Sequence, residues 1–378
     1  MAKQISSPRG MRDFLPSEKS RRERILAEIL AVYQSRGFQS IETPALENLD
    51  RLLSGQGGDN EKLAFQVLKR GEELEKAIQQ DDALADLGLR YDLTVPLTRF
   101  YASNHAELPR VFKALQTGPV WRAERPQKGR YRQFNQCDID ILGEQSTDAE
   151  LELLSASLEV LQVLGLEDAM IRVNHRGYLN RVMAELGVSD PAGVLITVDK
   201  LDKVGIEGVE KELSEKYDQQ LATNVVGWLS ADSAQPDELS EIISLSSKIK
   251  FDKTLVRGMG YYTGSVFEIE HPASGQSIGG GGRYDGMVGR WLGKDVPAVG
   301  ISLGFERVVD LVSKEFSTAK SLVIIYEDIN LALKIQQEAI AAGFDTRIEK
   351  RVKNTKALLE SMQAQGFGNF AMLADEQT

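Results

Sequence analysis

The stretch that most constrains the fold is residues 119–143, which reads as a strand, a loop and a second strand. Residues 120–123 have the character of a strand end, and residues 134–142 form an alternating run. The loop between them holds proline, glycine and four cations, which are Arg125, Lys128, Arg130 and Arg132. This order predicts a β-hairpin whose loop can bind a polyanion.

Three polar residues recur at every second position of the later run, namely Gln136, Asp138 and Asp140. Because neighbouring side chains of a strand point to opposite faces, these three share a face that can hold a small polar ligand. Arg122 and Arg130 suit a triphosphate, since a guanidinium stays charged and binds phosphate oxygens through paired N–H groups. The alternative, a solvated charged turn, is disfavoured because related motifs recur elsewhere in the chain.

Composition limits the remaining classes of function. With 378 residues, 42% hydrophobic and 27% charged, the chain is typical of a soluble protein of two or three domains. It has no apolar run of membrane-spanning length and no signal-peptide pattern at the N-terminus, so we expect a cytoplasmic protein without a membrane partner. A single cysteine, Cys137, excludes an intramolecular disulfide, and three scattered histidines give no zinc motif. A net charge of −11 argues against unspecific nucleic-acid binding but leaves room for a local basic patch.

Two further segments supply candidate binding residues upstream and downstream of the hairpin. Asp92 and Thr94 are spaced to share one face of an extended segment that Pro96 would end, and a carboxylate beside a hydroxyl suits a substrate ammonium. Arg257 lies in a glycine-bounded turn and is the best candidate for a lone charge inside a pocket. Residues 279–282 are four glycines within a strand pattern, which a flat ligand against the backbone or a flexible hairpin tip would explain. Arg307 lies one turn into a predicted helix.

The other segments predict scaffold. Residues 147–150 have the spacing of a helix capping box, and residues 176–250 indicate an inserted helical module. Residues 321–373 follow a βαβαβ order, which predicts a parallel sheet with covering helices. One side of this last unit is basic, with Arg347, Lys350, Arg351, Lys353 and Lys356. A sheet of three strands is thin for an independent domain, so we expect this unit to be truncated.

Taken together, these motifs resemble the histidyl-tRNA synthetases, which are class II aminoacyl-tRNA synthetases. The resemblance covers residues from about 8 to 312 and is most specific at residues 122–136, 255–262 and 279–307. It implies an α+β fold with a six-stranded antiparallel catalytic sheet flanked by helices, followed by an α/β domain similar to an anticodon-binding domain. It also implies a homodimer, ATP with Mg²⁺, L-histidine, and tRNA(His) as the acceptor. Pro44 matches the proline of the dimer-forming motif.

The resemblance assigns a role to each candidate residue. Arg257 and Arg122 match arginines on the reacting carboxylate and the α-phosphate, and are the implied catalytic residues. The implied ATP-binding residues are Arg122, Glu124, Arg130, Phe134 and Arg307, with Glu124 reading the adenine amino group and Phe134 stacking on the ring. The implied histidine-binding residues are Asp92, Thr94 and Gln136 for the α-amino group, Asp140 and Tyr262 for the imidazole, and Tyr261 for the pocket wall. The metal ligands are not assigned.

The same resemblance predicts four segments, with the catalytic domain in two parts, residues 1–175 and 251–316, around a helical insertion at 176–250. Residues 321–378 would be a partial anticodon-binding-like domain, shorter than that of the family. Gly260 departs from an aspartate common in the family. The alternative function is the histidine-sensing regulatory subunit of ATP phosphoribosyltransferase, a non-catalytic paralogue. The arginines at 122, 130, 257 and 307 favour the ligase, because a sensor does not need to hold a triphosphate.

Overall fold

The computed structural model of the chain describes residues 5–53, 63–126, 129–257, 261–314 and 320–373. The larger of its two compact units contains most of the chain up to Val312, and the smaller contains residues from Ser313 onward together with Asp13–Ala27. Two sequence predictions, the cation Lys128 and the departure at Gly260, lie outside the described residues. The division into four segments stays a prediction.

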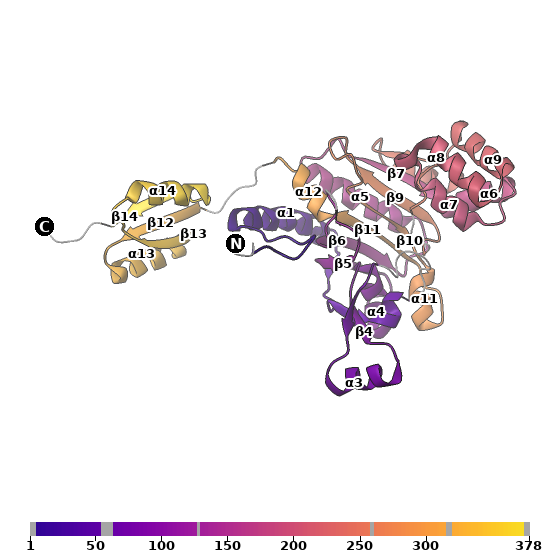
Figure 1. Ribbon diagram of the computed structural model, residues 1–378. Helices are drawn as coiled ribbons and strands as arrows, with labels where there is room; N and C mark the ends of the chain where they lie inside the picture. Colours follow the sequence, from indigo (N-terminus) through magenta and orange to yellow (C-terminus); the bar gives the residue numbers. More distant parts are fainter. Residues whose placement is uncertain (1–4, 54–62, 127–128, 258–260, 315–319, 374–378) are drawn as a thin grey trace. The chain divides into compact units, whose positions relative to one another are not determined.

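A mixed sheet of eight strands forms the centre of the larger unit (Figure 1). Its strands in spatial order are β1 (Gln39–Ser40), β5 (Phe112–Trp121), β6 (Gln133–Leu142), β11 (Ala298–Gly304), β10 (Gly279–Arg283), β9 (Ser265–Glu270), β7 (Met170–His175) and β8 (Ile249–Phe251). The six strands from β5 to β7 are antiparallel neighbours. The edge strand β1 pairs in parallel with β5, and the other edge strand, β8, pairs in parallel with β7. The predicted α+β class and antiparallel sheet are therefore confirmed, with one parallel strand added at each edge.

The predicted hairpin is formed by β5 and β6, which pair from Phe112 opposite Leu142 to Trp121 opposite Gln133. Gln136, Asp138 and Asp140 are buried on one face of β6, as their spacing indicates. The residues between them, such as Cys137 and Ile139, are buried on the other face, so the hairpin is covered on both sides.

Helices flank this sheet. They are α4 (Thr94–Asn104), α5 (Asp148–Val163), α11 (Gly286–Leu292), α12 (Phe305–Leu311) and the C-terminal part of α1 (Pro16–Ser35), whose residues 16–27 belong to the smaller unit. Helix α5 packs against β6 and β11, and α4 packs against α11. The predicted capping box is wrong, because Thr147 makes no side-chain bond at the start of α5. Glu150 is instead buried, and its carboxylate pairs with the guanidinium of Arg283.

The segment around Asp92 also differs from the prediction. Strand β4 (Ala85–Leu89) ends earlier, and Thr94 is the first residue of helix α4 rather than part of a strand. Pro96 is tolerated in the first helical turn, because the first N–H groups of a helix have no intrahelical partner. Asp92 accepts a hydrogen bond from the backbone N–H of Val95 at 3.0 Å, so its carboxylate is fixed at the beginning of the helix.

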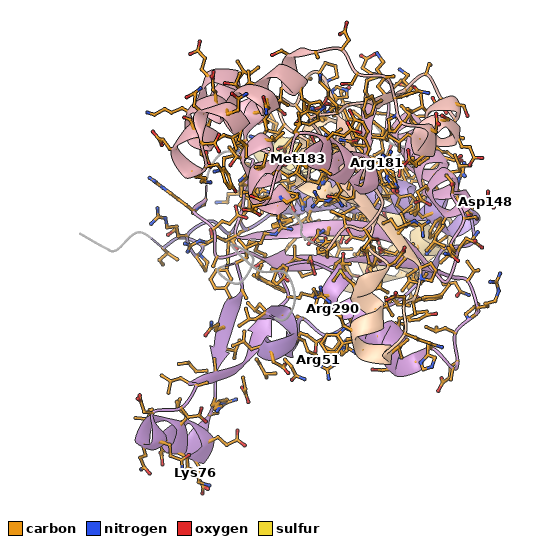
Figure 2. The ribbon with its side chains drawn as sticks, turned by 90° about the vertical axis from the view of Figure 1, so that its right-hand side faces the viewer. Arg51, Lys76, Asp148, Arg181, Met183 and Arg290 are labelled. Atoms are coloured by element: carbon orange, nitrogen blue, oxygen red, sulfur yellow. The ribbon has the colours of Figure 1, made fainter. Side chains whose placement is uncertain are left out.

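A small antiparallel sheet projects beside α4. It consists of β2 (Leu46–Asn48), β4 and β3 (Phe65–Leu68), with the short helix α2 (Leu49–Leu53) next to it. Helix α3 (Gly71–Gln80) joins β3 to β4. Figure 2 shows its Lys76 at the far end of this hairpin, away from the large sheet.

Most of residues 176–244 are in helices, whereas Ile249–Phe251, at the end of the predicted insertion of residues 176–250, form strand β8. The helices are α6 (Arg176–Glu185), α7 (Pro191–Val198), α8 (Leu201–Lys216), α9 (Gln219–Ser230), a 3₁₀ turn (Asp237–Leu239) and α10 (Ser240–Ser244). These helices have an apolar core of their own, in which Met183 and Leu213 are completely buried (Figure 2 labels Met183). We call residues 176–244 the helical module.

The smaller unit has the predicted βαβαβ order. Its strands β12 (Lys320–Tyr326), β13 (Phe344–Lys350) and β14 (Asn369–Met372) form a parallel sheet with β12 in the middle. Helices α13 (Ile329–Ala341) and α14 (Thr355–Ala364) lie on opposite faces of that sheet (Figure 1). Opposite faces are expected from the strand order. The chain moves in one direction along the sheet from β12 to β13 and in the other direction from β13 to β14, and two right-handed crossovers in opposite directions place their helices on opposite faces. In neither unit is a described helix both long and apolar enough to cross a membrane.

Candidate active site

Two adjoining cavities lie against the large sheet, and every candidate site residue of the sequence analysis lines one or both. The larger cavity has a volume of about 400 Å³, and its walls include Arg122, Glu124, Arg130, Phe134, Arg257 and Arg307. The smaller one has a volume of about 80 Å³, and its walls include Asp92, Thr94, Gln136, Asp140, Tyr261 and Tyr262. Arg122, Gln136 and Arg257 belong to both walls. The contents of the two cavities can therefore meet beside two guanidiniums.

The larger cavity is strongly cationic. Burial lowers the pKa of Arg307, and the positive charges of Arg130 and Arg122 lower it further. Arginines that repel each other in this way are stabilised by a bound anion. Arg307 is held by the backbone, since its guanidinium donates to the carbonyl oxygens of Ser277 and Gly129. Its charge is thus fixed in the wall before any ligand arrives.

Arg122 is also fixed by the backbone at the boundary of the two cavities. Its Nε donates to the carbonyl oxygen of Tyr91 at 3.0 Å, and its backbone N–H donates to that of Arg132 at 2.8 Å. The guanidinium carbon lies 5.0 Å from the centre of the Phe134 ring. The hairpin therefore places a charge and an aromatic face side by side, which suits an α-phosphate near an adenine ring.

The smaller cavity is lined by hydrogen-bond acceptors that have no donor. Asp92 Oδ2, Gln136 Oε1 and Asp140 Oδ2 are each buried without a hydrogen-bond partner. A buried polar atom without a partner costs about 1–3 kcal/mol. A ligand rich in N–H donors would recover that cost. Histidine offers such donors at both ends, because its ammonium carries three N–H groups and its imidazole carries at least one.

Asp140 is a buried acceptor of this wall, on strand β6. Its Oδ1 accepts a hydrogen bond from the Tyr284 hydroxyl at 2.6 Å, so Oδ2 is the oxygen left for a ligand. Burial raises the pKa of Asp140 to about 7; the Tyr284 hydrogen bond opposes the rise, and the charge of Asp92 adds to it. The carboxyl group can therefore change its protonation state near neutral pH.

This raised pKa predicts a pH-dependent stability. Between pH ~4 and ~7 the folded protein binds a proton at Asp140 that the unfolded chain releases, so stability falls as pH rises through this window. Asp140→Asn removes this pH-dependent loss of stability, because asparagine does not titrate, and the new amide oxygen can still accept the hydrogen bond from Tyr284. We expect the variant to gain about 1–3 kcal/mol of unfolding free energy relative to wild type between pH 5 and pH 8, measured by urea denaturation. The exposed Asp86→Asn is the control. If the variant and wild type differ in unfolding free energy by the same amount at pH 5 and at pH 8, the raised pKa of Asp140 is contradicted.

Arg257 has an unusual backbone conformation, with φ of 52° in a residue other than glycine. Its guanidinium lies over Gly280 of β10, where an added Cβ would come within 2.0 Å of Nη1. The sequence leaves two explanations for the glycine run, a ligand against the backbone or a flexible hairpin tip, and the second is wrong because the run forms the inner strand β10. At Gly280 an added Cβ would also lie 2.6 Å from the backbone carbonyl oxygen of Phe267, so glycine is required there whether or not a ligand is present.

Two polar wall residues of the smaller cavity, Tyr284 and Ser302, are absent from the sequence-based set. Asp138 also lines this cavity, as its period-two spacing with Gln136 and Asp140 predicts, although the resemblance assigns it no role. Ser302 lies opposite Asp138 in the pairing of β11 with β6, and Gln136 Nε2 donates to its hydroxyl at 2.9 Å. That register has no local signal in the sequence.

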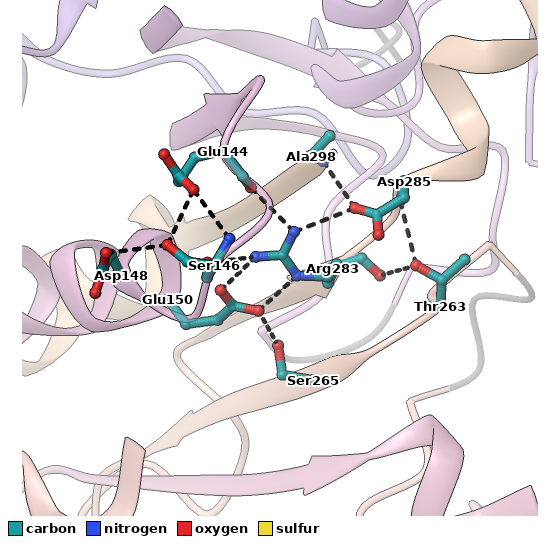
Figure 3. Close-up of polar contacts among 9 residues, drawn as sticks. All are labelled: Glu144, Ser146, Asp148, Glu150, Thr263, Ser265, Arg283, Asp285 and Ala298. Carbon is teal, nitrogen blue, oxygen red and sulfur yellow. Dashed lines mark hydrogen bonds and ion pairs between the residues drawn. The ribbon is translucent and has the colours of Figure 1, made fainter. Parts of the chain in front are cut away.

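A buried ion pair precedes Tyr284, a wall residue of the smaller cavity, and Figure 3 shows its polar contacts. Arg283 of β10 pairs with Glu150 of α5, and its Nε donates to Glu150 Oε1 at 2.7 Å. The same oxygen accepts from the Ser265 hydroxyl at 2.8 Å. The guanidinium also donates to the carbonyl oxygens of Glu144 and Ser146. The residue after Arg283 is Tyr284, so this pair fixes the backbone that carries the phenol on Asp140.

Among the described residues, no cluster of three or more His, Cys, Asp or Glu is arranged to hold a metal ion. The carboxylates of the larger cavity are Glu124, Glu268 and Glu306. Glu268 contacts Arg257, and Glu306 pairs with Arg12 and accepts from the Asn135 N–H. Such a wall fits a Mg²⁺ that takes most of its ligands from phosphates and water, which is the usual arrangement for that ion.

Comparison with known proteins gives consistent results. The family model described as histidyl-tRNA synthetase matches residues 10–308. A histidine–tRNA ligase from Leifsonia xyli is 49% identical, over 99% of this chain and 96% of that protein. Another from Aeropyrum pernix is 39% identical, over 80% of this chain and 73% of that protein.

Two solved structures share the fold. The histidyl-tRNA synthetase from Nostoc superposes with a TM-score of 0.77 at 26% identity, covering 97% of this chain and 90% of that one. A protein from Bacillus halodurans, described as an ATP phosphoribosyltransferase regulatory subunit/histidyl-tRNA synthetase, gives a TM-score of 0.74 at 21% identity, covering 98% and 99%. At that identity the second likeness extends to the fold alone.

Proposed function

This chain belongs to the histidyl-tRNA synthetase family, and from that premise we infer that it is a histidine–tRNA ligase. It uses ATP to convert L-histidine to histidyl-adenylate and transfers the histidyl group to the 3′ end of tRNA(His). The observation that carries the inference is the pair of adjoining cavities, one cationic and one lined by unpaired acceptors, which meet at Arg122, Gln136 and Arg257.

The first step requires that two anions be held together. The histidine carboxylate attacks the α-phosphate of ATP, and pyrophosphate leaves, so no protein nucleophile is needed. We assign Arg122 and Arg257 to the reacting carboxylate and α-phosphate, where their charges offset the negative charge that develops. Arg130 and Arg307 hold the outer phosphates, Phe134 stacks on adenine, and Glu124 reads its amino group. Mg²⁺ would supply further positive charge at the phosphates.

Recognition of histidine falls to the acceptors of the smaller cavity. We assign Asp92, Thr94 and Gln136 to the α-amino group, and Asp140 with Tyr262 to the imidazole, while Tyr261 forms the wall. An amino acid without an imidazole N–H would leave the buried Asp140 Oδ2 unpaired. Sites built in this way reject analogues strongly without an editing step.

We also propose that the protein is a cytoplasmic homodimer, since it supplies charged tRNA for translation and Pro44 matches the dimer-forming motif. The basic residues of the smaller unit are candidates for the tRNA contact. Several of them have acidic neighbours, because Arg351 pairs with Glu327 at 2.7 Å and Lys356 lies 4.0 Å from Glu360. We therefore expect a modest, salt-sensitive contribution from this surface.

The deciding experiment is amino-acid-dependent exchange of labelled pyrophosphate into ATP. We expect exchange with histidine and none with the other amino acids. The competing function, the histidine-sensing regulatory subunit, would bind histidine without exchange, and that result would overturn the ligase assignment. The arginines at 122, 130, 257 and 307, which all line the larger cavity, favour the ligase, because a sensor has no triphosphate to hold.

A further inference from the structure

Glu268 bridges two arginines on the face of the large sheet. It lies on β9, opposite Gly280 of β10 on one side and opposite Arg172 of β7 on the other. Its Oε2 is 3.1 Å from Arg257 Nη1, and its Oε1 contacts Arg172 Nη2. The two oxygens of one carboxylate therefore hold a residue of the candidate active site and a residue outside it.

Arg172 is in turn held by several carboxylates. Its Nη1 lies 2.8 Å from Asp252 Oδ2, and its Nη2 lies 2.8 Å from Glu270 Oε1 and 3.6 Å from Asp202 Oδ2 on helix α8 of the helical module. Its side chain is 19% exposed. Arg172 lines neither of the two substrate cavities, but it borders a third of about 1210 Å³ that is also lined by Arg257 and Glu268. The path of direct contacts from Arg172 to Arg257 runs through the carboxylate of Glu268.

Arg257 depends on such a contact for its orientation. Its backbone is in a conformation that residues other than glycine rarely adopt, and its guanidinium crosses the open surface of Gly280. The ion pair with Glu268 holds the guanidinium at the end of this long side chain in one position. A reacting group that is misplaced by about 1 Å can lose on the order of 10²-fold in rate, so this ion pair matters to catalysis.

We propose that Arg172 is a positioning residue for histidine activation: it fixes Glu268, and Glu268 holds the guanidinium of Arg257 at the boundary of the two cavities. The proposal rests on the inferred ligase activity. Its competitor is a purely structural role, in which Arg172 only neutralises the carboxylates around it. The two differ in one respect, because a positioning role disappears when Arg257 is absent and a structural role does not.

The test is a double-mutant cycle between Arg172→Met and Arg257→Ala, read by pyrophosphate exchange in the full-length protein. We expect Arg172→Met alone to lower kcat about 10-fold, with KM for histidine changed less than about 2-fold, because orientation is lost and ground-state binding is kept. In the Arg257→Ala background the same substitution should change kcat by less than about 2-fold. Arg181→Met, which removes an ion pair with Glu238 on the surface of the helical module (Figure 2), is the matched control.

Arg172→Lys keeps the test valid if the methionine variant does not fold. Lysine retains the charge but lacks the fork that reaches Asp252 and Glu268 together, so we expect near-normal thermal stability and a reduced kcat. Equal loss of kcat with and without Arg257 would overturn the proposal, as would unchanged kcat in both Arg172 variants. Failure of the ligase assignment would be distinct, since wild type itself would then show no exchange.

Discussion

Replacing Arg257 with alanine is expected to lower kcat for histidine-dependent pyrophosphate exchange by about 10²- to 10³-fold, the usual effect of removing one preorganised donor from a developing charge. Arg257 lines both cavities, and its guanidinium is fixed by Glu268 before substrates arrive. Arg122, Arg130 and Arg307 remain in the variant, so KM for ATP should change by less than about 3-fold.

Steady-state exchange kinetics at saturating ATP and histidine measure this effect. Arg257→Lys should recover only part of the rate, since an ammonium cannot replace the planar fork. Arg181→Ala on the surface of the helical module is the control and should keep wild-type kinetics. Wild-type kcat in Arg257→Ala would mean that the reacting atoms lie elsewhere in the cavities.

Replacing Glu150 with alanine is expected to lower the free energy of unfolding by about 3 kcal/mol, the lower end of the cost of breaking a buried ion pair, because of its carboxylate partners the Arg283 guanidinium keeps only the longer contact with Asp285 at 3.3 Å. The side chains of Arg283 and Glu150 are 10% and 5% exposed, so solvent screens the pair little. The loss should also reach the active site, since Arg283 fixes the backbone next to the Tyr284 that bonds Asp140.

Urea denaturation followed by circular dichroism gives the stability change. The double variant Glu150→Leu with Arg283→Met should lose much less than Glu150→Ala, because two apolar groups leave no buried charge behind. Lys76→Ala is the control, since its ion pair with Glu72 is exposed and such pairs contribute at most about 1 kcal/mol. A loss of less than about 1 kcal/mol in Glu150→Ala would show that Arg283 finds other partners.

The sequence predicts the parts of the site that depend on local periodicity. Gln136 and Asp140 share a face because a strand has a period of two, and the βαβαβ order alone implies the parallel sheet of the smaller unit. Thr94 was harder to predict, because Leu-Thr-Val before a proline has the β-branched composition of a strand. The helix prevails since the Asp92 carboxylate caps it and Val95 and Leu97 are buried.

Contacts between distant strands have no local signal. Arg172 and Glu268 are 96 residues apart, and they become neighbours only through the register of β7 with β9. Glu150 has the spacing of a capping residue, but its burial beside Arg283 decides its role. Sequence patterns predict which residues carry the chemistry, whereas the tertiary fold decides which residues hold them in place.

The wall shared by the two cavities also has a consequence for the reaction intermediate. Histidyl-adenylate would occupy both chambers at once, with its imidazole among the acceptors and its adenosine among the arginines. A molecule bound at both ends dissociates only when both sets of contacts break at the same time, so its residence time should exceed that of either substrate. The reactive anhydride should therefore stay bound until the acceptor RNA takes its acyl group.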